Sequence, residues 1–268
     1  MITSTPRLLR LWRLARLLFH FARGIAEVGL IFKHRPQEAQ EATVRRWSRK
    51  LCDILSIHIE VVGTPPVAHV GRTMVVANHV SWLDIFVLNA VVASRFVAKS
   101  EVRAWPLLGW LCHHSGTLFV QRERRHDTRR VNQEISDALV GLDLVSVFPE
   151  GGTTDGLDVA RFNASLLQPA IDVEAKLAPA ALCYLTADGH RTIAAAYVGE
   201  MSLLDSIRQI LAEPHITARV HYLPILPSKG LQRRELAAAA HHEIRQIVHK
   251  PLQDHHSQDV TRACRDAT

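Results

Sequence analysis

The sequence predicts an α/β protein with a single main domain, in which helices flank a largely parallel or mixed sheet. Two observations carry this prediction. Short apolar runs of β-like residues alternate with longer helical stretches between residues 57 and 223, and such alternation is typical of a sheet covered by helices. The composition, 47% hydrophobic and 22% charged over 268 residues, is that of an ordinary globular chain long enough for one substantial core.

The first half of the chain predicts strands and helices in turn. A helix is expected at 37–55, after Pro36, and a strand at 57–62 that ends at Gly63, since glycine and proline interrupt both kinds of element. The apolar runs and helical spacings that follow predict a strand at 73–77, a helix at 84–92, a strand at 95–98, a helix at 106–113, a strand at 117–121, a helix at 128–140 and a strand at 144–148.

The second half continues the alternation. The predicted elements are a helix at 163–176, strands at 180–185 and 193–198, a helix at 203–211, a strand at 216–223 and a last helix at 231–249. Pro224, Pro227 and Gly230 separate that last helix from the sheet, and a polar tail begins near His255. We therefore divide the chain into an arm at 1–36, a main domain at 37–227, and a C-terminal helix with its tail at 228–268.

The N-terminal arm carries the whole net charge of +6. Its seven basic residues oppose a single acidic one, Glu27, and are interleaved with large apolar residues such as Trp12 and Phe19. The basic residues are Arg7, Arg10, Arg13, Arg16, Arg23, Lys33 and Arg35. No stretch reaches the roughly 18 uncharged apolar residues of a spanning helix. The pattern predicts an amphipathic helix in the interface of an anionic membrane; a basic helix packed on its own domain is the alternative.

The cysteines and histidines give no sign of a metal or a disulfide framework. Cys52, Cys112, Cys183 and Cys264 form no Cys-x-x-Cys pair, which suits a reducing compartment. The histidine pairs at 113–114, 241–242 and 255–256 lack a metal-ligand geometry. No metal site is expected.

The stretch NHVSWLDIF, residues 78–86, places titratable groups between two apolar runs. Five residues of continuous helix rotate by about 140°, so His79 and Asp84 meet only if a strand ends and a helix begins between them. In the functional interpretation, Asp84 orients the imidazole of His79, which removes a proton from a substrate. In the structural one, Ser81 and Asp84 form a capping box that starts a helix at Trp82.

Two further stretches are unusual. In VFPEGGTTDG, residues 147–156, a strand runs into Glu150, Gly151 and Thr153. Glycines and exposed donors suit an anionic or oxygen-rich ligand, although a solvent loop is the simpler interpretation of this stretch alone.

In GTLFVQR, residues 116–122, Gly116 precedes an apolar strand that ends at Arg122, which is able to bind a phosphate through two parallel contacts. The mixed charges after Arg122, without interleaved aromatics, do not predict nucleic-acid binding.

Together, in this order and spacing, the three blocks resemble the glycerolipid acyltransferases, which include the lysophosphatidate acyltransferases of phospholipid synthesis. The resemblance covers about residues 72 to 200. The family's Asn-His-x-Ser-x-x-Asp block corresponds to Asn78, His79, Ser81 and Asp84. Its Gly-x-x-Phe-apolar-x-Arg block corresponds to Gly116, Phe119, Val120 and Arg122, and its Phe-Pro-Glu-Gly block to residues 148–151. Lys99 stands where the family commonly has a lysine before a Pro-x-x-Gly turn.

The resemblance implies a glycerolipid acyltransferase-like fold and a function. His79, held by Asp84, would help the hydroxyl of a lysolipid to attack an acyl thioester, most simply converting 1-acylglycerol-3-phosphate to phosphatidate. Asn78, Ser81, Lys99, Gly116, Arg122, Glu150, Gly151 and Thr153 would bind substrate. No cofactor is implied beyond acyl-CoA or acyl-carrier protein as co-substrate. The expected location is the cytoplasmic face of the inner membrane, where membrane lipids are the partners.

The chain departs from the family at Gly152, which replaces the usual threonine after Glu-Gly. The Thr-Asp-Gly continuation resembles bacterial members, including those that acylate lyso-ornithine lipid, so this lipid is the alternative acceptor. Two other classes remain. An esterase with Ser81 as nucleophile is one, although Ser81 lies only two residues from His79. A catalytically inactive membrane-binding scaffold is the other.

Overall fold

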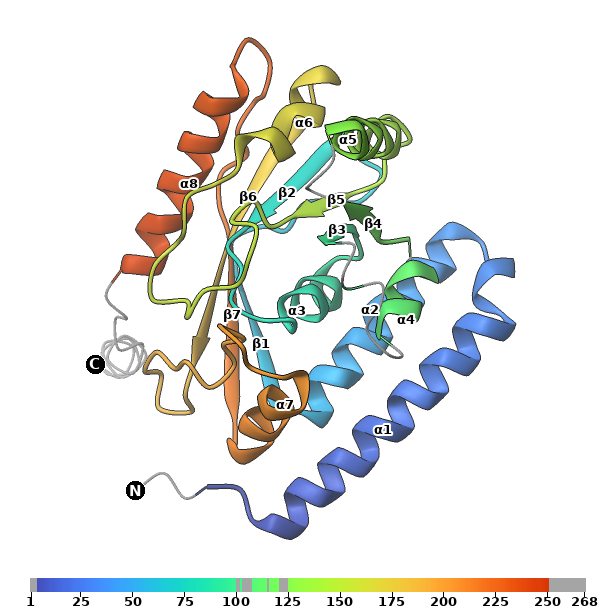
Figure 1. Ribbon diagram of the computed structural model, residues 1–268, viewed down its shortest axis with the longest axis vertical. Coiled ribbons are helices and arrows are strands. Elements are labelled where there is room, and N and C mark those ends of the chain that lie inside the picture. The colour runs from blue at the N-terminus through green and yellow to red at the C-terminus, as the bar shows by residue number, and fades with distance from the viewer. Residues whose placement is uncertain (1–3, 100–101, 103–107, 115, 121–124, 251–268) are drawn as a thin grey trace, which may run out of the picture.

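The computed structural model describes residues 4–99, 102, 108–114, 116–120 and 125–250. It contains a seven-stranded sheet with helices on both faces (Figure 1). The strands are β1 (Ile57–Val62), β2 (Thr73–Ala77), β3 (Arg95–Lys99), β4 (Leu118–Val120), β5 (Val145–Val147), β6 (Lys176–Leu185) and β7 (Ile216–Tyr222). The predicted α/β class is confirmed.

The sheet is mixed. Its strand order is β1-β7-β6-β2-β5-β3-β4. From β6 to β4 every neighbouring pair is parallel. Among the neighbouring pairs of the described strands, only β6 and β7 are antiparallel, and β1 runs parallel to β7. The carboxyl ends of β2, β3, β4, β5 and β6 therefore lie at the same edge, the usual place for a site in such folds.

Helices cover both faces of the sheet because the central strands are apolar on both sides. The helices are α1 (Arg7–Leu30), α2 (Gln37–Ile54), α3 (Asp84–Val91), α4 (Leu108–His114), α5 (Arg125–Val140), α6 (Gln168–Asp172), α7 (Leu203–Ala212) and α8 (Arg233–His249), with short 3-10 turns at Phe32–His34 and Ala164–Leu167. In β2, Val75 and Ala77 pack with α2, α3 and α7, whereas Met74 and Val76 pack with α5, α6 and α8. A strand buried on both faces reads as a continuous apolar run.

Two predicted elements are wrong. Residues 193–198 form turns and no strand, with the Ala196 amide donating to the Ile193 carbonyl and the Tyr197 amide donating to Val80. The run is apolar because Ala194, Ala195 and Ala196 are buried, and periodicity does not distinguish a buried turn from a buried strand.

The predicted helix at 163–176 is the other error. It is only a 3-10 turn followed by the short α6. Glu174 adopts a left-handed conformation with φ of 50°, and the Ala175 amide donates to the Ala170 carbonyl. This closure ends the helix and turns the chain into β6, which begins at Lys176.

The arm helix α1 lies across α2 and α7 (Figure 1). The guanidinium of Arg13 donates to the carbonyls of Glu213 and Pro214, at 3.0 and 3.2 Å. His20 stacks on Trp47 of α2 with ring centroids 4.5 Å apart. Several polar residues of α1 thus face the domain. Within the described residues no helix is long and apolar enough to cross a membrane.

Candidate active site

His79 and Asp84 meet where β2 ends and α3 begins. The chain bends through residues 78–83, and His79 Nδ1 comes within 2.8 Å of Asp84 Oδ2. Because a carboxylate only accepts, Nδ1 carries the hydrogen of this bond. The second ring nitrogen, Nε2, then has a free lone pair. A neutral imidazole in this tautomer is suited to accept a proton at Nε2.

Asp84 is fully buried, and four donors surround its carboxylate. Oδ2 accepts from His79 and from the backbone amides of Val80 and Ser81, at 2.7 and 2.9 Å. Oδ1 accepts from the Tyr184 hydroxyl at 2.7 Å. A buried carboxylate is costly unless it is hydrogen-bonded, and these four donors replace the water that Asp84 has lost.

The predicted capping box at Ser81 is wrong. Helix α3 starts at Asp84 with Leu83 as its N-cap and no side-chain cap. Asp84 does accept from the Ser81 amide, but Ser81 Oγ is buried without a hydrogen-bond partner among the described residues. The carboxylate is already saturated with donors from the bend, and the serine side chain faces the interior.

The imidazole plane is fixed by an aromatic stack. His79 lies against Phe148 with ring centroids 4.0 Å apart and an interplanar angle of 8°. Phe148 in turn stacks on Phe96 of β3, with centroids 5.7 Å apart. Asp84 contacts the imidazole at its edge, and Phe148 contacts its face. These two contacts leave the ring little rotational freedom.

Glu150 holds the backbone of His79. Its Oε1 accepts from the His79 amide at 2.6 Å, and its Oε2 accepts from the Ala160 amide at 2.7 Å. Burial raises the pKa of Glu150 to about 7, against the opposing effect of these two backbone donors. Both oxygens are therefore engaged with the protein itself.

Other predicted substrate-binding residues also bond to the backbone. Asn78 makes a two-way contact with Leu182, donating to its carbonyl at 3.0 Å and accepting from its amide at 2.7 Å. The Thr153 hydroxyl donates to the Tyr197 carbonyl, and the Gly151 amide donates to Phe148 at 3.3 Å. These contacts tie the end of β2, the loop after β5 and the strand β6 into one unit around His79.

The Gly-x-x-Phe-apolar-x-Arg block, residues 116–122, is placed differently. Gly116 lies before β4, at the amino edge of the sheet, where its carbonyl accepts from Arg95 Nε at 3.1 Å. His79 lies at the opposite, carboxyl edge. Lys99 ends β3 at the same edge as His79, and only its backbone is described. Arg122 lies outside the described residues.

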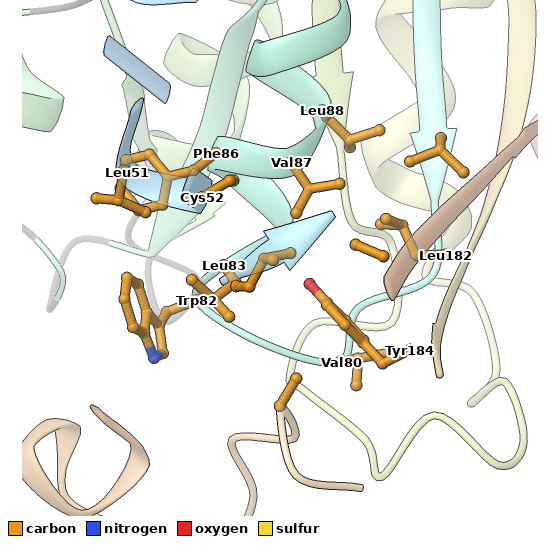
Figure 2. Close-up of a cluster of buried hydrophobic side chains, with 14 of the residues drawn as sticks. Leu51, Cys52, Val80, Trp82, Leu83, Phe86, Val87, Leu88, Leu182 and Tyr184 are labelled. Carbon is orange, nitrogen blue, oxygen red and sulfur yellow. The ribbon is translucent and has the colours of Figure 1, made fainter. Parts of the chain in front are cut away.

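Sequence reasoning missed Tyr184. This residue lies in the buried strand β6, with its ring among Val80, Leu83 and Leu182 (Figure 2). Burial and the neighbouring Asp84 raise its pKa well above the ordinary value, so the hydroxyl stays protonated and donates. It lies 100 positions from Asp84 in sequence, and no local pattern connects a tyrosine in an apolar run to a carboxylate so distant.

The fold and the site define a class: an α/β protein with a buried aspartate and a partly exposed histidine at the carboxyl edge of its sheet. Among the described side chains, no group of three His, Cys, Asp or Glu residues is arranged to hold a metal ion. A family model described as Acyltransferase matches residues 58–183, a range that contains His79, Asp84 and Glu150 and ends one residue before Tyr184.

Relatives with assigned activities extend this match over most of the chain. It is 34% identical to a lyso-ornithine lipid O-acyltransferase of Pseudomonas aeruginosa over 246 residues, 89% of this chain and 93% of that protein. It is 36% identical to a 1-acyl-sn-glycerol-3-phosphate acyltransferase of Neisseria meningitidis serogroup B over 217 residues, 81% and 83% of the two chains. The chain belongs to the acyltransferase family, and it is an acyltransferase.

A solved structure shares the fold. The crystal structure of the 1-acyl-sn-glycerophosphate acyltransferase PlsC from Thermotoga maritima matches with a TM-score of 0.68 at 18% identity, covering 90% of this chain and 93% of that one. The glycerolipid acyltransferase-like fold expected from the three sequence blocks is confirmed.

Replacement of Tyr184 by phenylalanine is expected to lower kcat about tenfold and the free energy of unfolding by about 1–3 kcal/mol. The change leaves Asp84 Oδ1 buried without a donor, which costs energy and weakens the hold on His79. Steady-state kinetics and urea unfolding measure the two effects. Tyr222→Phe is the matched control, because the Tyr222 hydroxyl has no hydrogen-bond partner among the described residues. Wild-type turnover in Tyr184→Phe would show that this hydroxyl is not needed.

Proposed function

We propose that His79 is the general base in the transfer of a fatty acyl group from an acyl thioester to the free hydroxyl of a lysolipid. The observation that carries this proposal is the hydrogen bond from His79 Nδ1 to the buried Asp84, which leaves Nε2 as the proton acceptor. The side chain of His79 keeps 19% of its surface exposed, so a substrate hydroxyl has access to the ring. General-base assistance of this kind accelerates a reaction by ~10²–10⁴.

The proposed step balances in atoms and charge. The lysolipid hydroxyl oxygen bonds to the thioester carbonyl carbon as its proton moves to His79 Nε2. The tetrahedral intermediate then collapses, the carbon–sulfur bond breaks, and the imidazolium returns its proton to the departing thiolate. Asp84 stabilises the imidazolium between these two transfers, while its own charge stays constant.

A direct attack fits the surroundings of His79 better than a covalent enzyme intermediate. Ser81 Oγ is buried and makes no hydrogen bond to the imidazole, whereas a serine nucleophile requires that contact. Burial raises the pKa of Cys52 to about 12 and that of Cys112 to about 11, so neither supplies a thiolate near neutral pH. The esterase interpretation is therefore not favoured.

For the acceptor we favour 1-acylglycerol-3-phosphate, with phosphatidate as product, in phospholipid biosynthesis. Relatives in two Neisseria species carry this activity in their names, at 36% and 38% identity. Lys99, Arg122 and the loop of Gly151 and Thr153 would surround the phosphate. Lyso-ornithine lipid is the second candidate, because the relative from Pseudomonas aeruginosa is matched over 93% of its length. Acyl-CoA or acyl-carrier protein would supply the acyl group.

The outer face of α1 supports attachment to a membrane. At 100° per residue, the apolar exposed residues of α1 fall on one stripe along the helix. They include Leu8, Leu11, Trp12, Leu18, Phe19 and Leu30, which are between 59% and 82% exposed. The buried side of the helix instead carries Arg13 and His20. An apolar stripe of this length on a solvent-facing helix marks an interaction surface, and a bilayer suits a lipid-modifying enzyme.

The arginines complement this stripe. By the same helical rotation, Arg16 and Arg23 border the stripe on one side and Arg7 borders it on the other, where they would meet anionic headgroups as the apolar residues enter the interface. We therefore place the enzyme on the cytoplasmic face of the inner membrane as a peripheral or monotopic protein. In the alternative function, a catalytically inactive scaffold, the protein would bind the membrane in the same way but would not transfer acyl groups.

The proposed mechanism predicts that His79→Ala lowers the kcat of acyl transfer by at least about a hundredfold, in a protein that remains folded.

Asp84→Asn should also inactivate the enzyme, because the amide group of the new side chain donates toward His79 and disfavours the required tautomer. Asp84→Asn should lose less stability than Asp84→Ala, since it retains one acceptor for the bend. Turnover assays with circular dichroism as the folding control measure these effects; near-normal turnover of His79→Ala would refute the base assignment.

The acceptor is decided by a panel of lysolipids offered with both acyl-CoA and acyl-carrier protein. We expect 1-acylglycerol-3-phosphate to give the highest kcat/KM. Arg122→Lys should raise the KM for this acceptor at least about tenfold while the KM for the thioester changes little, because lysine does not reproduce a two-point contact with phosphate. Higher kcat/KM with lyso-ornithine lipid would identify the second candidate, and an unchanged acceptor KM would remove Arg122 from the site.

The membrane surface is tested by vesicle flotation of a double variant, Trp12→Ser with Phe19→Ser. Both side chains are exposed, so the variant should keep its fold and lose most binding to anionic vesicles. Added salt should weaken the binding of the wild type, because the basic residues act through screened charges. The control is Val67→Ser with Val70→Ser, which removes equally exposed apolar side chains outside α1. Equal binding of the two double variants would exclude α1 as the anchor.

A further inference from the structure

Residues 149–162, the loop between β5 and the turn at Ala164–Leu167, connect the site to the C-terminal helix. At one end of the loop, Glu150 accepts the backbone amide of His79. At the other end, Asp158 and Val159 lie against α8, the helix that the sequence places outside the main domain. The loop thus passes from the edge of the sheet that carries His79 to the face covered by α8.

Asp158 is held to α8 by three donors from two side chains. Arg245 donates to both carboxylate oxygens, from Nε at 2.7 Å and from Nη2 at 2.9 Å. His249 Nε2 lies 2.8 Å from Oδ1, one helical turn further along. The Val159 amide also donates to Oδ1, at 2.7 Å. The hydrogen bonds from Arg245 hold the pKa of Asp158 well below its usual range. We call Asp158, Arg245 and His249 the Asp158 clamp.

Helix α8 contacts the same segment at two more points. His241 Nε2 lies 3.1 Å from the Val159 carbonyl, so its hydrogen is directed to the backbone next to the clamp. The ring of His241 also meets Phe162 edge-on, with centroids 5.1 Å apart. Val159 and Phe162 are buried in the core cluster that includes the apolar side of α8. Residues 158–162 are thus fixed on both sides of Ala160.

Ala160 is the link to the base. Its amide donates to Glu150 Oε2 at 2.7 Å, and Glu150 Oε1 accepts from the His79 amide at 2.6 Å. The same loop also contacts the backbone carbonyl of His79, which accepts from the Thr154 amide at 2.8 Å. A continuous series of contacts therefore runs from Arg245 through Asp158, the backbone to Ala160, and Glu150 to His79.

We propose that α8 positions the catalytic base through the Asp158 clamp, so that Asp158, Arg245 and His249 are positioning residues for acyl transfer although none of them touches the imidazole. The proposal rests on the role of His79 proposed above. Glu150 in this arrangement is the last member of the series and acts on the His79 backbone rather than on a ligand. The C-terminal helix is then a working part of the acyltransferase domain.

Because the clamp is exposed, its effect on the position of His79 can be distinguished from an effect on the stability of the protein. The side chains of Arg245 and Asp158 are 47% and 55% exposed, and ion pairs this exposed contribute little to the stability of a protein. Misplacement of a catalytic group by about 1 Å, in contrast, is able to lower a rate about a hundredfold. Loss of the clamp should therefore appear in kcat and hardly in the melting temperature.

The test compares Arg245→Ala with the wild type in the full-length protein. We expect kcat to fall about tenfold, while KM for either substrate stays within about twofold and the melting temperature is nearly unchanged. Amide hydrogen exchange, measured by NMR, should become at least about tenfold faster at His79 and Ala160, with no change in β6. Arg245→Lys should recover part of kcat by restoring one contact to Asp158. Arg233→Ala is the matched control, since this arginine lies on the same helix and bonds to Gln168.

A double-mutant cycle with Glu150→Gln tests the route. If the clamp acts through Glu150, Arg245→Ala should change kcat by less than about twofold in the Glu150→Gln background. A full effect there, or a fall in kcat without faster exchange at His79 and Ala160, would overturn the proposed route. Unchanged kcat in Arg245→Ala would overturn the positioning role. Hydrogen exchange requires no turnover, so a failure of the His79 assignment would be recognised separately, by an active His79→Ala enzyme.

Discussion

The architecture around the site depends on one buried negative charge. Asp84 has no exposed surface, and a carboxylate in that position is stable only if donors replace the water it has lost. Two donors are amides of the bend between β2 and α3, one is His79, and one is Tyr184 from β6. The charge thus fixes the path of the chain after β2, the tautomer of the histidine, and the position of a neighbouring strand.

Most polar residues in the sequence blocks hold the backbone of the site. Asn78 bridges β2 to β6, Thr153 bonds to the turn at Tyr197, and Glu150 spans His79 and Ala160. In the proposed mechanism, a base that acts on a substrate hydroxyl benefits from such support, since misplacement by about 1 Å is costly in rate. Residue types that suggest ligand binding when read along the chain are, in this fold, largely committed to preorganisation.

Two amphipathic helices are used in opposite ways. Helix α8 has its apolar side in the core and its charged side on the loop that supports His79. Helix α1 docks on the domain partly through Arg13 and His20 and leaves an apolar stripe outside. A helix that exposes its apolar side is unfavourable in water alone. In our proposal the bilayer covers that stripe, so the surface that the domain leaves uncovered is the one that brings the protein to its substrate.

The sequence by itself determined the α/β class, nearly all of the strands and helices, and the pair of His79 and Asp84, because these follow from local apolar periodicity and from residues five positions apart. It gave the wrong structure for 193–198, where a buried turn has the same apolar character as a strand. Only the tertiary structure decided that Tyr184 completes the carboxylate site and that α8 contacts the loop of Glu150. Those contacts join residues about 100 and 87 positions apart, and the packing of the sheet, rather than any local pattern, brings them together.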